Sequence, residues 1–174
     1  KQRTGNYLER VYRLYLLAKI GSPQVGEMNI LYENNLNQLT TTESWLLAAA
    51  YHLMGDTNAS RSISNNLEAT PSRMFSAGTF DSTIRKQAIM LSSMIDMGDN
   101  TLAPDLAEDM LEKLSTKTWY STQSIGYSLM SIGRYLTDYA INPNPISGTI
   151  VFDKKSLPFE IDKISTTLTI PNTV

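Results

Sequence analysis

Acidic side chains at helical spacing are the first residues whose types could support chemistry. Asp105, Glu108, Asp109 and Glu112 fall on one face of an expected helix. Paired carboxylates in such a place can act as an acid and a base, or hold a cation. The segment has neither a loop glycine nor the spacing of an EF-hand, so a solvated helix face is the favoured interpretation.

His52 is the single histidine, and the chain contains no cysteine. These counts exclude a multi-histidine metal site, a thiol nucleophile, a thiolate metal site and a disulfide. We expect a structural role for His52, because it follows Tyr51 at the end of an apolar helix. The sequence therefore predicts no metal, no cofactor and no enzymatic activity.

Composition narrows the classes of partner. The 174 residues are 41% hydrophobic and carry a net charge of -2, which provides no basic field for nucleic acid. The longest apolar run, residues 45–51, is far shorter than the roughly 20 residues of a membrane helix. We therefore expect no nucleic-acid binding and no membrane insertion by this segment. Because Lys1 precedes a helix almost directly, we also expect a piece of a larger protein.

Glycines and capping residues divide the chain into seven expected helices. The first covers residues 6–20 and ends at Gly21, and Ser22-Pro23 starts the second with an N-cap and a proline at the first helical position. The third starts at a capping box, Thr40-x-x-Glu43, and ends at Gly55. The other predicted signals are Asp56 for the fourth helix, residues 82–97 with Gly98 for the fifth, Asp99 or Thr101 for the sixth, and Ser121 or Thr122 for the seventh.

Odd and even helices differ in their apolar pattern. The odd helices are apolar on most of their circumference, as residues 45–54 illustrate, whereas the even helices carry one apolar stripe each. This difference predicts parallel inner helices wrapped by outer ones. The fold class we expect is mainly α, an open α/α toroid of helical hairpins with a short β tail.

The character of the sequence changes after Tyr139. The Asn-Pro-Asn-Pro run at residues 142–145 cannot continue a helix, because proline lacks the amide donor and restricts the residue before it. Residues 148–152 and 164–170 have the pattern of strands. We expect a helical domain over residues 1–140, and a linker with β-strands over residues 141–174 that packs on the helices or on another copy.

One motif carries more specific information. Residues 119–124, Trp-Tyr-Ser-Thr-Gln-Ser, lead into an apolar helix that ends near Tyr135. This motif resembles the Trp-x-Ser-Thr-Gln signature near the end of the thioester domain of bacterial alpha-2-macroglobulins. Four earlier segments, residues 12–21, 28–31, 44–55 and 80–91, resemble successive helices of that domain in the same order. At Arg85 the family usually shows an acidic residue next, whereas Lys86 follows here, so the resemblance supplies no ion pair within that dipeptide.

The resemblance implies an endopeptidase inhibitor that traps proteases and resides in the periplasm or cell envelope. The family's thioester joins a cysteine to a glutamine in a Cys-x-Glu-Gln segment, which this chain lacks. That segment lies upstream in the parent, or the parent belongs to the members without it. The chain would be the latter part of the thioester domain and the first strands of a flanking β-domain. Its partners would be proteases, through the parent, and neighbouring β-domains, and its role that of scaffold and shielding surface.

The candidate interface is the rim formed by Trp119, Tyr120, Thr122 and Gln123. Since the odd helices are expected to be parallel, these residues should lie at the same end as Thr40 and Ser82, where helix N-termini present amide donors. Two aromatic side chains before a capped helix suit burial against a partner. The alternative is that Trp119 fills the core of its own domain.

Two other functions fit parts of the pattern. The interval from Gly21 to Gly55 is 34 positions, which suits a tetratricopeptide-like module that binds a peptide or glycan, although the Trp-x-x-Leu-Gly-x-x-Tyr pattern is absent. A toroidal enzyme acting on glycans would need clustered carboxylates. Asp81, between Phe80 and Ser82, is the nearest candidate for that chemistry.

Overall fold

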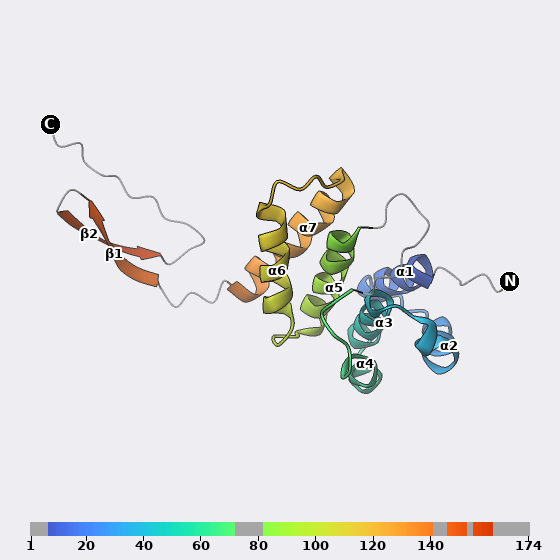
Figure 1. The fold of residues 1–174 in the computed structure, drawn as a ribbon. Helices are drawn as coiled ribbons and strands as arrows, with labels where there is room; N and C mark the ends of the chain where they lie inside the picture. Colours follow the sequence, from blue (N-terminus) through green and yellow to red (C-terminus); the bar gives the residue numbers. More distant parts are fainter. Residues whose placement is uncertain (1–6, 72–81, 141–145, 153–154, 162–174) are drawn as a thin grey trace. The chain divides into compact units, whose positions relative to one another are not determined.

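The computed structural model describes residues 7–71, 82–140, 146–152 and 155–161 (Figure 1). Contacts divide the chain into two units, residues 1–135 and 136–174. The helices are α1 (Tyr7–Lys19), α2 (Val25–Asn35), η1 (Leu36–Gln38), α3 (Thr41–Leu53), α4 (Thr57–Ser64), α5 (Thr83–Met97), α6 (Ala103–Ser115), α7 (Thr122–Tyr135) and η2 (Leu136–Ala140). The strands are β1 (Ile146–Phe152) and β2 (Lys155–Ile161). The chain is mainly helical with a short antiparallel sheet near its C-terminus, which confirms the coarse fold prediction.

Most predicted helix ends are confirmed by the caps. At the start of α3, the Glu43 amide donates to Thr40 Oγ1 at 3.4 Å and the Thr40 amide donates to Glu43 Oε2 at 2.7 Å. Asp56 Oδ1 accepts from the amide of Ala59 at 2.9 Å. Gly98 ends α5 with φ of 69°, a left-handed conformation that glycine adopts at little cost. Local sequence therefore determines where these helices begin and end.

Two predicted helix starts are wrong. α2 begins at Val25 and not at Ser22-Pro23, because the Ser22 amide is used to end α1, donating to Leu17 O at 2.8 Å. α6 begins at Ala103, and Asp99 caps the turn before it by accepting from the amides of Thr101 and Leu102 at 2.8 and 3.2 Å. In each case a tight turn takes the residues that were expected to start the helix.

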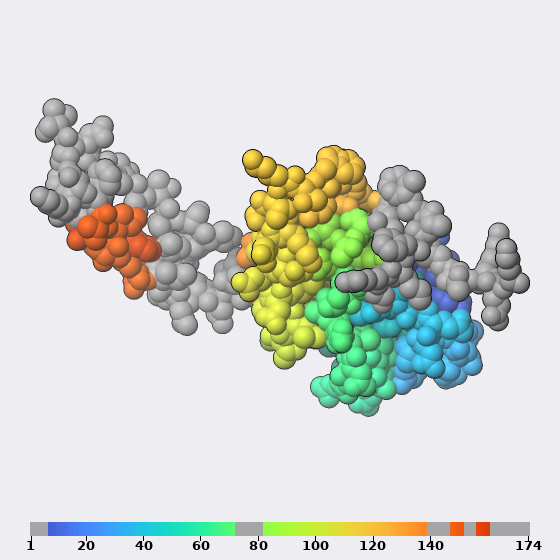
Figure 2. Space-filling view, viewed as in Figure 1, coloured from blue at the N-terminus to red at the C-terminus, as the bar shows by residue number. Residues whose placement is uncertain are grey.

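The odd helices form the inner row of the helical part. α1 packs on α3, α3 on α5, and α5 on α7, while α2, α4 and α6 pack on α1, α3 and α5. Figure 2 shows these even-numbered helices on the viewed face of the helical part. The contacts thus connect the odd helices in one row, with one even helix against each of α1, α3 and α5.

The core is centred on α3 and α5. Residues 42–51 of α3 are all buried, including Trp45 and Tyr51. α7 differs from the prediction for odd helices, because its buried residues are Ser124, Ser128, Ser131 and Ile132. None of the helices in the described part of the chain has the length and apolarity that a bilayer crossing requires.

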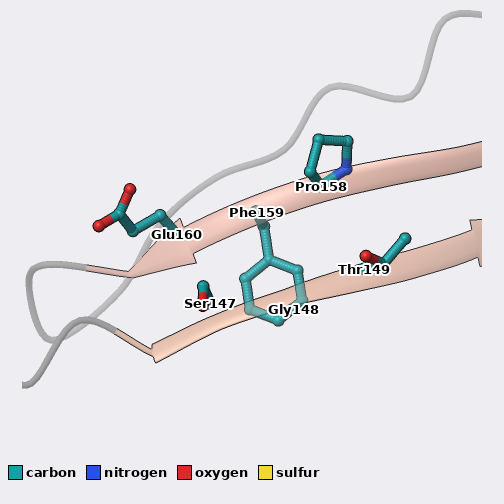
Figure 3. A pocket seen from close by; sticks show the side chains of 6 residues that line it. All are labelled: Ser147, Gly148, Thr149, Pro158, Phe159 and Glu160. Carbon is teal, nitrogen blue, oxygen red and sulfur yellow. The ribbon is translucent and has the colours of Figure 1, made fainter.

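The hairpin of the second unit pairs β1 with β2, and Gly148 lies opposite Phe159 (Figure 3). A Cβ atom at Gly148 would lie 2.7 Å from Phe159 Cζ, so only glycine leaves room for the ring. Ile150 and Leu157 pair on the same face as Phe159. The predicted strand over residues 148–152 is confirmed, β2 was not predicted, and residues 164–170 lie outside the described residues.

Candidate functional site

Serine hydroxyls join the N-terminal ends of α5 and α7. The Ser124 hydroxyl donates to Ser82 Oγ at 2.9 Å, and Ser121 Oγ accepts from the Ser124 amide at 3.2 Å. Of the two predicted caps, Ser121 is therefore the one whose side chain caps α7. Ser82 in turn accepts from the amide of Arg85 at 3.3 Å. These hydroxyls align the two helix ends.

The predicted rim residues have different surroundings. Gln123 Oε1 accepts from Arg85 Nη1 at 2.7 Å, which adds a second link between α7 and α5. Tyr120 is half-buried and donates its hydroxyl to Lys113 O at 3.2 Å, at the end of α6. Thr122 is exposed at the first position of α7. Three elements thus meet at this end of the helical part.

Trp119 projects into solvent. Its side chain is 85% exposed, the highest value among the large hydrophobic residues of the described chain. The alternative that Trp119 fills the core is therefore wrong. An exposed tryptophan beside a helix end is a surface suited to burial against a partner.

The inner helices run parallel, as their end contacts show. At one end, the Tyr7 hydroxyl of α1 donates to Gln38 Oε1, just before α3, at 3.0 Å. At the other end, Lys19 of α1 and Arg134 of α7 both bind Asp96 of α5. Residues 40, 82 and 122 therefore lie at the same end of the row, as the sequence predicted.

Asp96 is the centre of a charged cluster that sequence reasoning missed. Its side chain is 6% exposed and lies 2.7 Å from Lys19 Nζ and 2.6 Å from Arg134 Nη2, and it also accepts a hydrogen bond from the Tyr15 hydroxyl. Burial raises the pKa of Asp96, but the hydrogen bonds from Lys19, Tyr15 and Arg134 outweigh it, so the pKa lies below its ordinary value. The carboxylate is thus held ionised between three helices.

Tyrosines complete the contact between α1 and α7. The hydroxyl oxygens of Tyr12 and Tyr127 lie 3.4 Å apart, and their ring centroids 6.5 Å apart in an edge arrangement. Burial, and then the Tyr127 hydroxyl, raise the pKa of Tyr12. This pair links α1 and α7, the first and last helices of the row.

The sequence contained a signal for the Asp96 cluster. Lys19, Asp96 and Arg134 each lie in the last turn of an expected inner helix. Parallel helices bring their last turns together, so an ion pair between these opposite charges could have been predicted. The cluster contains no nucleophile, and its arrangement serves to hold α1, α5 and α7 together.

The acidic stretch on α6 is mostly a solvated face, as predicted. Asp105, Glu108 and Glu112 are exposed. Asp109 differs, because it binds Lys113 at 2.5 Å and accepts a hydrogen bond from the buried Gln87. Within the described ranges, no group of acidic or histidine side chains could hold a metal ion.

The remaining residues considered for chemistry give no site. His52 is half-buried at the end of α3, while Asp81 lies outside the described residues. The hollow on the hairpin is lined by Ser147, Gly148, Thr149, Pro158, Phe159 and Glu160 (Figure 3). Glu160 is its single ionisable group, so the hollow lacks an acid and base pair.

Comparison with known proteins finds no family model, no curated protein and no solved structure that matches this chain.

Proposed function

We propose that this chain is the latter part of the thioester-type domain of a bacterial alpha-2-macroglobulin-like endopeptidase inhibitor. In this proposal the inner row belongs to an open α/α toroid, and the hairpin supplies the first strands of the flanking β-domain. The parent resides in the periplasm or cell envelope and traps proteases. This segment contributes scaffold and shielding surface, and it has no acyl donor because the chain has no cysteine.

The observation that carries the proposal is the exposure of Trp119 beside an ordered helix end. Its side chain is 85% exposed, while Ser121, Ser124 and Ser82 fix the helix start next to it. An aromatic surface on a rigid support suits docking of a neighbouring domain or cover for a labile bond. The rim holds no histidine and no cysteine, which favours shielding over catalysis.

The contacts of the inner helices support a scaffold over the tetratricopeptide-like alternative. Serine and glutamine side chains link the helices at one end, and Asp96 links them at the other. Tyr12 and Tyr127 contact each other between α1 and α7. Their ring surfaces are used within the domain, whereas a peptide-binding groove would present them to a ligand.

Replacement of Trp119 by alanine in the full-length parent tests the proposal. We expect faster spontaneous loss of the thioester, measured as methylamine incorporation, or premature conformational change on native gels, while the helical domain stays folded. Ile30→Ala is the matched control, since Ile30 is 51% exposed on α2, a helix that contributes no residue to the rim. Trapping and thioester lifetime equal to wild type in Trp119→Ala would refute the shielding role.

A further inference from the structure

On α7 the buried face is mostly polar and the exposed face carries large apolar side chains, the reverse of the usual arrangement. Ser124, Ser128 and Ser131 are buried, whereas Leu129 and Met130 are each 63% exposed. Exposed apolar side chains gathered on one helix face indicate a surface that becomes covered. We propose that this outer face of α7, formed by Gly126, Leu129, Met130 and Gly133, is covered by the same face of a second copy of the chain. This inference does not depend on the proposed function.

Charge restricts what can cover this face. Residues 118–133 contain no charged side chain, so a charged partner would be desolvated there without an opposite charge. In the described part of the chain, the other helices with an exposed face carry charge on it: Glu9 and Arg13 on α1, Glu33 on α2, Arg61 on α4, and Glu108 and Glu112 on α6. Among these faces, α7 is complementary to itself.

The glycines provide a second reason for close approach. Gly126 and Gly133 are exposed within α7, where a Cβ atom would meet nothing within 4 Å. Glycine in an exposed helix lowers its stability relative to alanine. A second backbone approaching the face would use that space.

The spacing of the four residues has the symmetry that a twofold interface requires. Gly126 lies three positions before Leu129, and Gly133 lies three positions after Met130. A twofold axis between Leu129 and Met130 therefore pairs the helices antiparallel, with Gly126 facing Gly133 of the second copy. Helical side chains lean toward the N-terminus of their helix. Leu129 therefore extends over the space left by Gly133 of the second copy. The twofold axis gives two equivalent copies of this contact.

The size of the contact sets its strength. α7 has 14 residues, about 21 Å at 1.5 Å per residue. One such helix pair buries on the order of a few hundred Å² per partner, less than the roughly 800 Å² of a stable interface. We therefore expect a weak dimer in rapid exchange, which forms at high protein concentration.

Sedimentation of the full chain tests for this dimer. Between about 10 µM and about 1 mM, the range expected for small interfaces, the average mass should rise from 19.4 kDa toward twice that value. Met130→Glu and Met130→Lys should each weaken association at least about tenfold through like charges at the axis, and an equimolar mixture should restore it. Leu111→Glu on α6 should leave the dimer unchanged.

A cysteine placed at the axis tests the geometry. The chain has no cysteine, so Met130→Cys creates the only thiol, and mild oxidation should give a disulfide dimer faster than Leu111→Cys does. Circular dichroism verifies that each variant is folded. The proposal is overturned if the protein stays monomeric throughout, which would leave the face to a helix of another protein. It is equally overturned if Met130→Glu alone still dimerises, or if both cysteine variants cross-link at one rate.

Discussion

α3 and α7 belong to the same row of inner helices, yet they bury opposite kinds of side chain. α3 buries an unbroken run, residues 42–51, that includes Trp45, two leucines and three alanines. α7 is one residue longer and buries three serines and Ile132, while Leu129 and Met130 are exposed. Hydrophobic content therefore does not determine which side of an inner helix is covered.

Neighbours account for the difference. α3 packs against α1, α4 and α5, so it must be apolar around most of its circumference, whereas α7 packs mainly against α5. Small side chains on the covered face let α7 approach α5 closely. Their hydroxyls remain satisfied, because Ser124 donates to Ser82 Oγ at 2.9 Å, Ser128 to Ser124 O at 2.8 Å and Ser131 to Ser128 O at 3.1 Å.

Replacing each of the two tryptophans should give the largest effect that tests this comparison. Trp45 in α3 is 1% exposed and its Nε1 donates to Glu68 O at 3.1 Å, so Trp45→Ala should lower the free energy of unfolding by about 3–5 kcal/mol. Trp119→Ala, beside α7, should change it by no more than about 0.5 kcal/mol. Urea unfolding at low protein concentration measures both.

Fluorescence quenching provides the control for the tryptophan pair. In Trp119→Ala the remaining Trp45 should be protected from iodide, and in Trp45→Phe the remaining Trp119 should be quenched readily. Equal quenching in the two variants would contradict the difference in burial.

The Asp96 cluster tests how α7 is held by polar contacts. Asp96→Asn should lower the free energy of unfolding by about 2 kcal/mol at pH 7, less than for a fully buried pair because Lys19 and Arg134 are one-third exposed. The folded pKa of Asp96 lies below its ordinary value of 3.8. Its contribution is therefore present above about pH 4 and is lost as pH falls through the folded pKa.

A pH series separates this effect from general acid unfolding. The difference in the free energy of unfolding between wild type and Asp96→Asn should stay nearly constant from pH 7 to about pH 5, and it should shrink as pH falls below about 4 toward the folded pKa of Asp96. Glu108→Gln, at an exposed position in the middle of α6, is the matched control and should follow wild type. A difference that stays constant down to the lowest pH would show that the charge of the Asp96 carboxylate is not what stabilises the contact between α1, α5 and α7.

Local signals explain how much of this fold could be predicted. Thr40, Asp56 and Gly98 act through bonds within a few residues, so their roles were readable from sequence. Helical periodicity shows which residues share a face, but not which face a neighbour covers, and this is why the exposure of Leu129 was missed. β2 was missed because Pro158 weakens the strand pattern.

The candidate site was predictable to a similar extent. Parallel inner helices were enough to place Gln123 near Ser82 at one end of the row. The exposure of Trp119 was left open, because sequence does not show whether a side chain turns toward its own core. The Asp96 cluster depends on three helices far apart in the chain, so it needed the tertiary structure.

The smallest expected effect concerns Gly126, whose replacement should raise the free energy of unfolding, whereas the replacements above lower it or leave it unchanged. Gly126→Ala should raise the free energy of unfolding of the monomer by about 0.5–1 kcal/mol, because alanine favours the helix and its methyl group meets nothing within 4 Å. Gly98→Ala is the matched control and should destabilise, since φ at Gly98 is 69°. Thermal unfolding at about 5 µM, well below the range expected to support a weak dimer, measures both variants. A loss of stability in Gly126→Ala would mean that the outer face of α7 is already covered within one chain, and the contrast with α3 would then be smaller than the exposures of Leu129 and Met130 indicate.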